Sequence, residues 1–184
     1  MLYHVGRVFI LHGFNNMLKQ DIAAALEVAF SQYGFAEPSV AKLQKLSGVS
    51  LRTLYKYYPS KQAMIIAALE YRHTRYFHFL LENSPKPGVD AVLHMFDQLK
   101  LWMQEFAPNG CLSINALSAF PEDEAISNAV QNHKNEVRQL LGKQSLNTTM
   151  ASALFLLHEG VSSAWPVMGD EAVITAKQSI LQLI

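Results

Sequence analysis

Hydrophobic residues along most of the chain recur every three or four positions, which is the spacing of an amphipathic α-helix. Ile22, Leu26 and Phe30 share one face in this way, and Gly34 follows them as a helix C-cap would. No convincing two-residue alternation of a β-strand occurs. The pattern predicts an all-α protein with helices over residues 17–33, 39–47, 50–57, 60–81, 88–107, 112–119, 122–142, 147–165 and 170–183.

Residues 39–58 contain two short helices separated by a turn at Gly48. Ser39 and Ser50 are suited to cap them, because a serine hydroxyl accepts a hydrogen bond from a free backbone N–H of the first turn. Gly48 permits the positive φ of a tight bend, and Pro59 ends the second helix. The arrangement predicts a helix-turn-helix, whose second helix enters the major groove of DNA.

Each of these short helices has one apolar face. The residues of each face are three or four positions apart, and most residues between them are polar or charged. Val40, Leu43 and Leu46 face one side of the first helix, and we expect Leu51, Leu54 and Tyr58 to be the buried positions of the second.

The stretch SVAKLQKLSGVSLRTLYKYYPSKQAM, residues 39–64, resembles the N-terminal domain of the TetR family of bacterial transcriptional regulators. The preceding ALEVAFSQYGF resembles the first helix of that family, so the match covers residues 18–70. Leu43-Gln44 stands where Ile-Ala is usual, and Tyr58 replaces the common Phe. The resemblance implies a DNA-binding domain followed by a helical domain that binds a ligand and forms a homodimer through its last two helices.

We therefore expect three segments. Residues 1–16 are interpreted as an irregular N-terminal arm, with Met17 as a candidate native start, because the segment lacks the basic region and cleavage site of a signal peptide. Residues 17–70 are assigned to the DNA-binding domain, and residues 71–184 to the ligand-binding and dimerisation domain. Residues 1–70 hold seven Lys/Arg against four Asp/Glu, a balance compatible with a phosphate-facing module in a chain of zero net charge.

The resemblance directs the second short helix toward DNA. Arg52 is suited to bidentate recognition of guanine O6/N7, which is worth about 1–3 kcal/mol of discrimination, and Leu51 to contact with a thymine methyl. Phosphate contacts are expected from polar residues of the motif and from Lys61, which lies near the free N–H groups of the next helix. Tyr57 and Tyr58 are assigned to the core. The predicted DNA-binding residues are Ser39, Lys42, Ser50, Leu51, Arg52, Thr53, Tyr55, Lys56 and Lys61.

Polar or polarizable residues within the apolar helices of the second domain are the candidates for a ligand pocket. Cys111 is the single cysteine, so an intramolecular disulfide is excluded and a reducing, cytoplasmic compartment is expected. A redox role for Cys111 would need a neighbouring cation, which the sequence does not identify. The pocket candidates are His94, Trp102, Met103, Phe106, Cys111, Asn115, Phe120, His158 and Trp165.

The last helix has two apolar stripes. Val173, Ala176, Ile180 and Ile184 form one, and Ile174 and Leu181 form the other. We expect one stripe to face the protein's own core and the other a second copy of the chain, with a monomeric bundle as the alternative.

Catalytic, cofactor-binding and metal-binding patterns are not found. GVSSAW lacks the G-x-S-x-G spacing, no phosphate loop occurs, and the histidines have no metal-ligand spacing. We interpret the chain as a ligand-responsive homodimeric repressor that binds a quasi-palindromic DNA operator and a small, largely apolar effector. Two alternatives stay open: an architectural DNA binder without an inducer, and a helical protein-interaction module.

Overall fold

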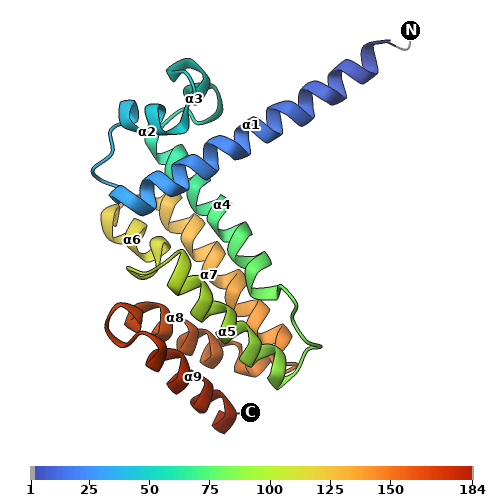
Figure 1. Cartoon of the computed structure of the whole chain (residues 1–184), viewed down its shortest axis with the longest axis vertical. Coiled ribbons are helices and arrows are strands. Elements are labelled where there is room, and N and C mark those ends of the chain that lie inside the picture. Colours follow the sequence, from blue (N-terminus) through green and yellow to red (C-terminus); the bar gives the residue numbers. More distant parts are fainter. Residues whose placement is uncertain (1–2, 184) are drawn as a thin grey trace. The chain divides into compact units, whose positions relative to one another are not determined.

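The computed structural model describes the backbone of residues 3–183 and the side chains of residues 16–183. Within those limits the chain consists of α-helices and one short 3₁₀ helix, without a strand (Figure 1), so the all-α prediction is confirmed. The helices are α1 Tyr3–Tyr33, α2 Val40–Ser47, α3 Leu51–Tyr57, α4 Lys61–Leu81, α5 Val89–Glu105, α6 Leu112–Ala119, α7 Glu124–Gln144, η1 Thr148–Met150, α8 Ala151–Met168 and α9 Asp170–Leu183.

The chain divides into two compact units. The first unit contains the residues up to Arg72 together with Asn115–Ile126, and the second contains His73–Ile114 together with Ser127–Ile184. Helices α4, α6 and α7 each begin in one unit and end in the other. The sequence-based division at residue 70 did not anticipate that residues 115–126 would group with the N-terminal unit.

Helix α1 begins at Tyr3 and continues to Tyr33. The prediction of an irregular arm over residues 1–16 is therefore wrong for residues 3–16, and residues 1–2 lie outside the described residues. The segment contains two glycines, Gly6 and Gly13. A glycine inside a helix costs only about 1 kcal/mol relative to alanine, and no proline interrupts this segment.

In the first unit α2 packs against α1, and α3 packs against α2. Each short helix is anchored by one fully buried leucine, Leu43 in α2 and Leu54 in α3. Leu51 is 48% exposed, so the prediction that it is buried is wrong, and Leu46 of α2 is 41% exposed. Helices of eight and seven residues make only about two turns, which leaves room for little more than one inward-facing position on each.

In the second unit α5, α8 and α9 pack against one another around a shared apolar core. Val173, Ala176 and Ile180 of α9 are buried in that core, as the first stripe predicted. Ile174 and Leu181 are 55% and 61% exposed. The two stripes of α9 therefore face different environments; Ile184 lies outside the described residues. Among the residues that the structure describes, no helix is both long and apolar enough to cross a membrane.

Candidate nucleic-acid interface

Serine hydroxyls begin both helices of the predicted helix-turn-helix. Ser39 Oγ accepts a hydrogen bond from the backbone N–H of Lys42 at 3.2 Å, and Ser50 Oγ accepts one from Thr53 at 3.1 Å. The Thr53 hydroxyl lies 2.8 Å from Ser50 Oγ. Each serine satisfies a backbone donor that the first turn of a helix leaves unpaired, so α2 and α3 begin where the sequence predicted.

The turn between α2 and α3 depends on Gly48 and Gln44. Gly48 has φ +69°, a left-handed conformation in which a residue with a side chain is strained. The Gln44 side-chain amide donates a hydrogen bond to the backbone carbonyl of Val49, which braces the turn from α2. This contact gives a structural role to the departure from the family pattern at residue 44, a role that the sequence comparison did not reveal.

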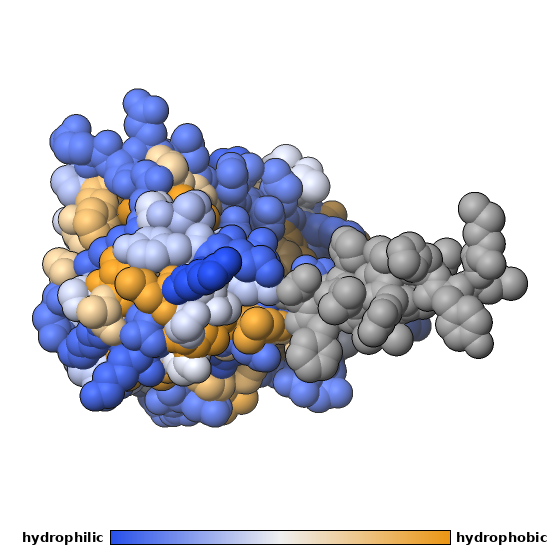
Figure 2. Space-filling view, turned by 90° about the horizontal axis from the view of Figure 1, so that it is seen from above, coloured by the Kyte–Doolittle hydropathy of each residue, from blue (hydrophilic) through white to orange (hydrophobic). Residues whose placement is uncertain are grey.

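The outer face of α3 presents the residues predicted to meet DNA. Arg52 and Lys56 are exposed, and Leu51 and Tyr55 are 48% and 42% exposed. The Lys56 ammonium lies 5.3 Å from the centre of the Tyr57 ring. Figure 2 shows the molecule from above the view of Figure 1. The surface seen there carries many hydrophilic residues with hydrophobic ones between them. Such a mixture suits a face that contacts both phosphates and base edges.

Tyr58 holds the C-terminal end of α3 against α1. Its ring is 5% exposed, and its hydroxyl donates a hydrogen bond to the backbone carbonyl of Lys19 at 2.9 Å. Burial, and in second place the negative charge of Glu70, raise the pKa of Tyr58 to about 12. The assignment of Tyr58 to the core is confirmed, and this tyrosine, which replaces the Phe common at the position, fixes α3 rather than offering a hydroxyl to DNA.

Two of the predicted phosphate contacts are tied to the segment between α1 and α2. The Lys42 ammonium lies 2.9 Å from a Glu37 carboxylate oxygen and 3.5 Å from the centre of the Tyr33 ring. The Lys61 ammonium donates a hydrogen bond to the backbone carbonyl of Ala36 at 3.1 Å, and partial burial lowers the pKa of Lys61. Both lysines stay near the motif, but a phosphate would have to compete with these partners.

Asp123 connects the start of α7 to α4 within the first unit. Its carboxylate accepts hydrogen bonds from the backbone N–H of Ile126 at 3.0 Å and from the Gln62 amide at 2.9 and 2.8 Å. The backbone bond from Ile126, followed by the bond from Gln62, lowers the pKa of Asp123. The contact between Gln62 and Asp123 could not be predicted from local patterns, because the two residues are 61 positions apart.

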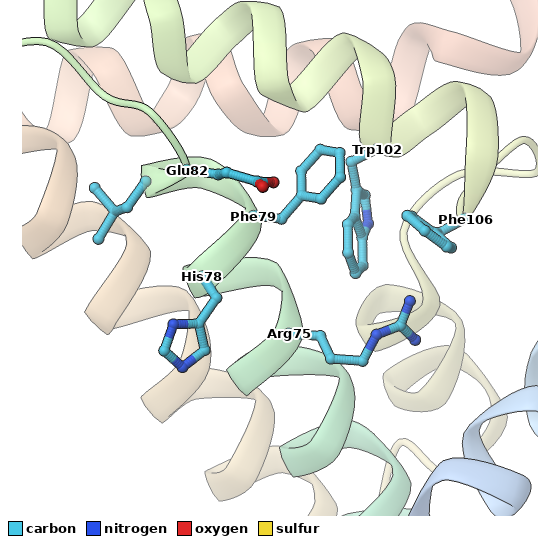
Figure 3. A pocket seen from close by; sticks show the side chains of 7 residues that line it. Arg75, His78, Phe79, Glu82, Trp102 and Phe106 are labelled. Carbon is cyan, nitrogen blue, oxygen red and sulfur yellow. The ribbon is translucent and has the colours of Figure 1, made fainter.

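A cavity of about 610 Å³ lies in the second unit between α4 and α5 (Figure 3). The Trp102 ring stands between Phe79 and Phe106, with ring centres 5.4 and 4.7 Å away. The Arg75 guanidinium carbon lies 5.5 Å from the centre of the Trp102 ring and 4.7 Å from that of Phe106. The lining residues are Arg75, His78, Phe79, Leu81, Glu82, Trp102 and Phe106.

Trp102 and Phe106 are the two pocket candidates from the sequence that line this cavity. Met103 and Trp165 are buried in the apolar core of the second unit. His94 Nε2 lies 2.8 Å from the backbone carbonyl oxygen of Glu82. The remaining candidates fall elsewhere: Asn115 and Phe120 in the first unit, and Cys111 and His158 in a separate polar cluster.

That polar cluster lies within the second unit and is partly buried. His158 is 4% exposed, with its Nε2 hydrogen-bonded to the Tyr76 hydroxyl and its Nδ1 3.0 Å from Glu159. Complete burial lowers the pKa of His158 even though Glu159 acts in the opposite direction. Glu159 in turn accepts hydrogen bonds from the Lys134 ammonium, which also contacts the sulfur of Cys111 at 3.3 Å. A buried cation beside Cys111 is a contact that the sequence did not reveal. No group of three or more metal-binding side chains occurs among the described residues.

Comparison with known proteins gives a family model that matches part of the first unit. Residues 22–68 match the model of the bacterial regulatory proteins of the tetR family. A search of curated proteins gave no match.

Solved structures match over nearly the whole chain. A TetR-family transcriptional regulator from Streptomyces coelicolor has a TM-score of 0.78 at 15% identity, with 91% of this chain and 89% of that chain covered. The reduced form of NemR from E. coli has a TM-score of 0.74 at 24% identity, with coverages of 90% and 95%. A TetR-family regulator from Agrobacterium tumefaciens has a TM-score of 0.70 at 12% identity, with coverages of 92% and 98%. At these identities the likeness concerns the fold.

Proposed function

We propose that this protein is a sequence-specific, ligand-responsive, homodimeric repressor of transcription, because residues 22–68 match the model of the tetR family and the whole chain resembles the fold of TetR-family regulators. The observation that carries the proposal is the outer face of α3, where Arg52 and Tyr55 are exposed while Leu54 anchors the helix from behind. In this proposal the protein binds DNA in the cytoplasm and does not act as an enzyme.

In this proposal the residues of the motif have two roles. Arg52 reads a base edge, and Leu51 contacts a thymine methyl next to it. Phosphates are contacted by the polar residues around α3 and by the lysines of α2 and α4, which fix the position of the protein on the duplex. The contacts of Lys42 with Glu37 and of Lys61 with the Ala36 carbonyl hold both ammonium groups beside the motif, and a phosphate would replace these partners.

The second, exposed stripe of α9 supports dimerisation. Ile174 and Leu181 lie on α9, and Leu156 and Val167 on α8 are 69% and 90% exposed. Apolar side chains gathered on two neighbouring helices are typical of a surface that a second copy covers. A dimer joined in this way would bring two α3 helices to half-sites of a quasi-palindromic operator, about 10 base pairs apart or a multiple of that distance.

The cavity between α4 and α5 is the candidate effector site. Three aromatic rings line it, which favours a small, largely apolar effector with a flat ring system. The effector would weaken DNA binding only if it binds more tightly to a conformation that holds the two α3 helices at another separation. Loss of the DNA complex on titration with such compounds would support this part of the proposal.

Selection from a randomised duplex library at about 0.15 M salt tests the proposal. The expected product is a palindromic consensus for the wild-type protein, relaxed at one position by Arg52→Ala. Lys61→Ala is expected to weaken binding to all sequences about equally, because it contacts phosphate.

Lys86→Ala is a matched control, since Lys86 is exposed and lies in the second unit, away from the motif in the sequence. It should leave the consensus unchanged. Absence of any enriched sequence, or binding that is indifferent to Arg52→Ala and Lys61→Ala alike, would contradict the proposed function.

A further inference from the structure

The cavity between α4 and α5 holds one arginine against its aromatic rings. The Arg75 guanidinium carbon lies 5.5 Å from the ring centre of Trp102 and 4.7 Å from that of Phe106. Such stacking uses the flat face of the guanidinium, whereas its N–H donors lie in the plane of the group and match the oxygens of a carboxylate. Arg75 is half-buried, so water weakens a contact here less than at the open surface. The Arg75 side of the cavity therefore suits an acidic group.

A second hollow of about 560 Å³ adjoins this cavity and shares Phe79 and Glu82 with it. The other polar residues of its lining are Glu105 and side-chain amides, and no Lys, Arg or His occurs among the described residues that line it. Glu82 is held at the end of α4, because its backbone carbonyl oxygen lies 2.8 Å from His94 Nε2 and accepts a hydrogen bond from the Gln98 amide at 3.3 Å. The second hollow therefore suits a positively charged group.

Aromatic rings lie between the two charged places. Arg75 and Glu82 are seven positions apart, which corresponds to about 10 Å along a helix. Figure 3 shows their side chains on opposite sides of Phe79, whose ring centre lies 5.4 Å from that of Trp102. We name the two hollows together the α4–α5 groove. It combines a cation, stacking surface and carboxylates in one place of the second unit.

We propose that the α4–α5 groove binds a flat aromatic zwitterion, a molecule with a carboxylate at one end of its ring system and a basic nitrogen at the other. The carboxylate pairs with Arg75, and the ring system stacks on Phe79 and Trp102. The nitrogen lies beside the carboxylates of Glu82 and Glu105. A neutral ring system of the same shape would gain only the stacking.

The inference rests on the proposed function, because it concerns the candidate effector site. It keeps the flat ring system proposed for the effector and adds an acidic and a basic group to it. Its test, however, is binding to the protein alone. The charge preference of the groove can therefore be measured whether or not the ligand alters DNA binding.

Calorimetric titration of the full-length protein without DNA tests the inference with a series of biphenyls. One probe carries a carboxylate at one end and an aminomethyl group at the other, two probes carry only one of these groups, and the last carries a neutral hydroxymethyl group. The zwitterion should bind most tightly. Loss of its carboxylate should weaken binding about 10-fold or more, as for a hydrogen bond to a charged group, and loss of its amine about 2- to 5-fold, because Glu82 is exposed.

Three variants assign the preference to residues. Arg75→Gln should abolish the advantage of the carboxylate, so that the zwitterion and the amine bind this variant equally. Glu82→Gln should narrow the advantage of the amine, while the backbone carbonyl of residue 82 stays available to its partners. Arg138→Gln is the matched control, because Arg138 is exposed on α7, donates a hydrogen bond to Asn135 at 2.6 Å and lines neither hollow. It should keep the wild-type order of the probes.

The order of the probes on the wild type decides the question even if Arg75→Gln folds poorly. Binding of the neutral probe as tightly as the zwitterion, tightest binding of a probe with a single charge, or no binding of any probe would overturn the inference.

Operator DNA is added only in a second step, so that the two proposals can fail separately. Binding of the zwitterion with the expected order, but without release of the operator, would support the inference and contradict the proposed ligand response. Absence of probe binding to a protein that still selects a palindromic consensus would overturn the inference and leave sequence-specific DNA binding in place.

Discussion

The basic residues of α3 and the lysine of α7 show two opposite ways to place positive charge in one chain. Arg52 and Lys56 lie on a seven-residue helix, and both side chains are exposed to solvent. Lys134 is enclosed in the second unit, with its charge matched by Glu159 and its nitrogen against a sulfur. Exposed charge is available for a partner, whereas enclosed charge is committed to the fold.

The difference determines what a substitution should change. Removal of an exposed charge alters recognition of another molecule and leaves the free energy of unfolding within about 0.5 kcal/mol. Removal of one member of an enclosed pair leaves the other charge buried and unmatched, which lowers the free energy of unfolding directly. Substitutions at exposed and at buried positions should therefore have different effects on the free energy of unfolding.

The largest expected effect comes from the residue that fixes α3 in place. Leu54 is completely buried, so Leu54→Ala should lower the free energy of unfolding by about 2–5 kcal/mol through lost burial and the cavity left behind. Denaturation in urea measures this. Leu51→Ala, on the exposed side of the same helix, is the control and should change stability little. Similar losses for both variants would mean that α3 has no distinct inner and outer face.

Within the second unit the enclosed ion pair should matter more than a surface pair. Glu159→Gln should destabilise the protein by about 3 kcal/mol, because Lys134 keeps its charge in a mostly buried position. Asp97→Asn, which breaks the Lys177–Asp97 pair, should cost less than about 1 kcal/mol, since both side chains are substantially exposed. Urea denaturation of the two variants under the same conditions gives the difference. Equal losses would contradict the distinction between exposed and enclosed charge.

A smaller effect is expected from pH. His133 stacks on His73 with ring centres 4.2 Å apart, and burial, then the neighbouring His73, lower the pKa of His133 to about 4 from its ordinary 6.5. The unfolded chain therefore binds a proton before the folded one does, and the stability from neutral His133 is lost as pH falls from 6.5 toward 4.

Urea denaturation at about pH 7.5 and about pH 5 measures this loss. His133→Gln should reduce the difference between the two pH values, and His78→Gln, at an exposed histidine of α4, is the matched control. An unchanged difference in His133→Gln would show that other groups account for the acid sensitivity of the protein.

Local signals in the sequence were sufficient for the helices of the first unit. Ser39, Gly48 and Ser50 act through hydrogen bonds and backbone angles within four residues of themselves, so their roles could be predicted from residue type and spacing. The same spacing failed for Leu51, which was predicted to be buried. A periodic pattern identifies an apolar face but does not tell how many of its residues a short helix actually buries.

Contacts between distant residues could not be predicted. The bond from Lys61 to the Ala36 carbonyl, and the contact between Cys111 and Lys134, depend on how separate helices pack, which no local pattern in either segment records. The sequence identified Cys111 as a thiol of interest but supplied no cation near it. For the same reason only Trp102 and Phe106 among the pocket candidates line the cavity between α4 and α5.

Sequence-specific DNA binding, as proposed, depends most on Arg52 as the residue of α3 that contacts a base. Its direct test is the affinity of the wild type and of Arg52→Ala for two duplexes, the selected operator and the same operator with one base pair changed at the position that Arg52 is inferred to read. The account predicts that the wild type discriminates between them by about 5- to 150-fold, the equivalent of about 1–3 kcal/mol, and that Arg52→Ala binds both equally. Equal discrimination by the two proteins would contradict it.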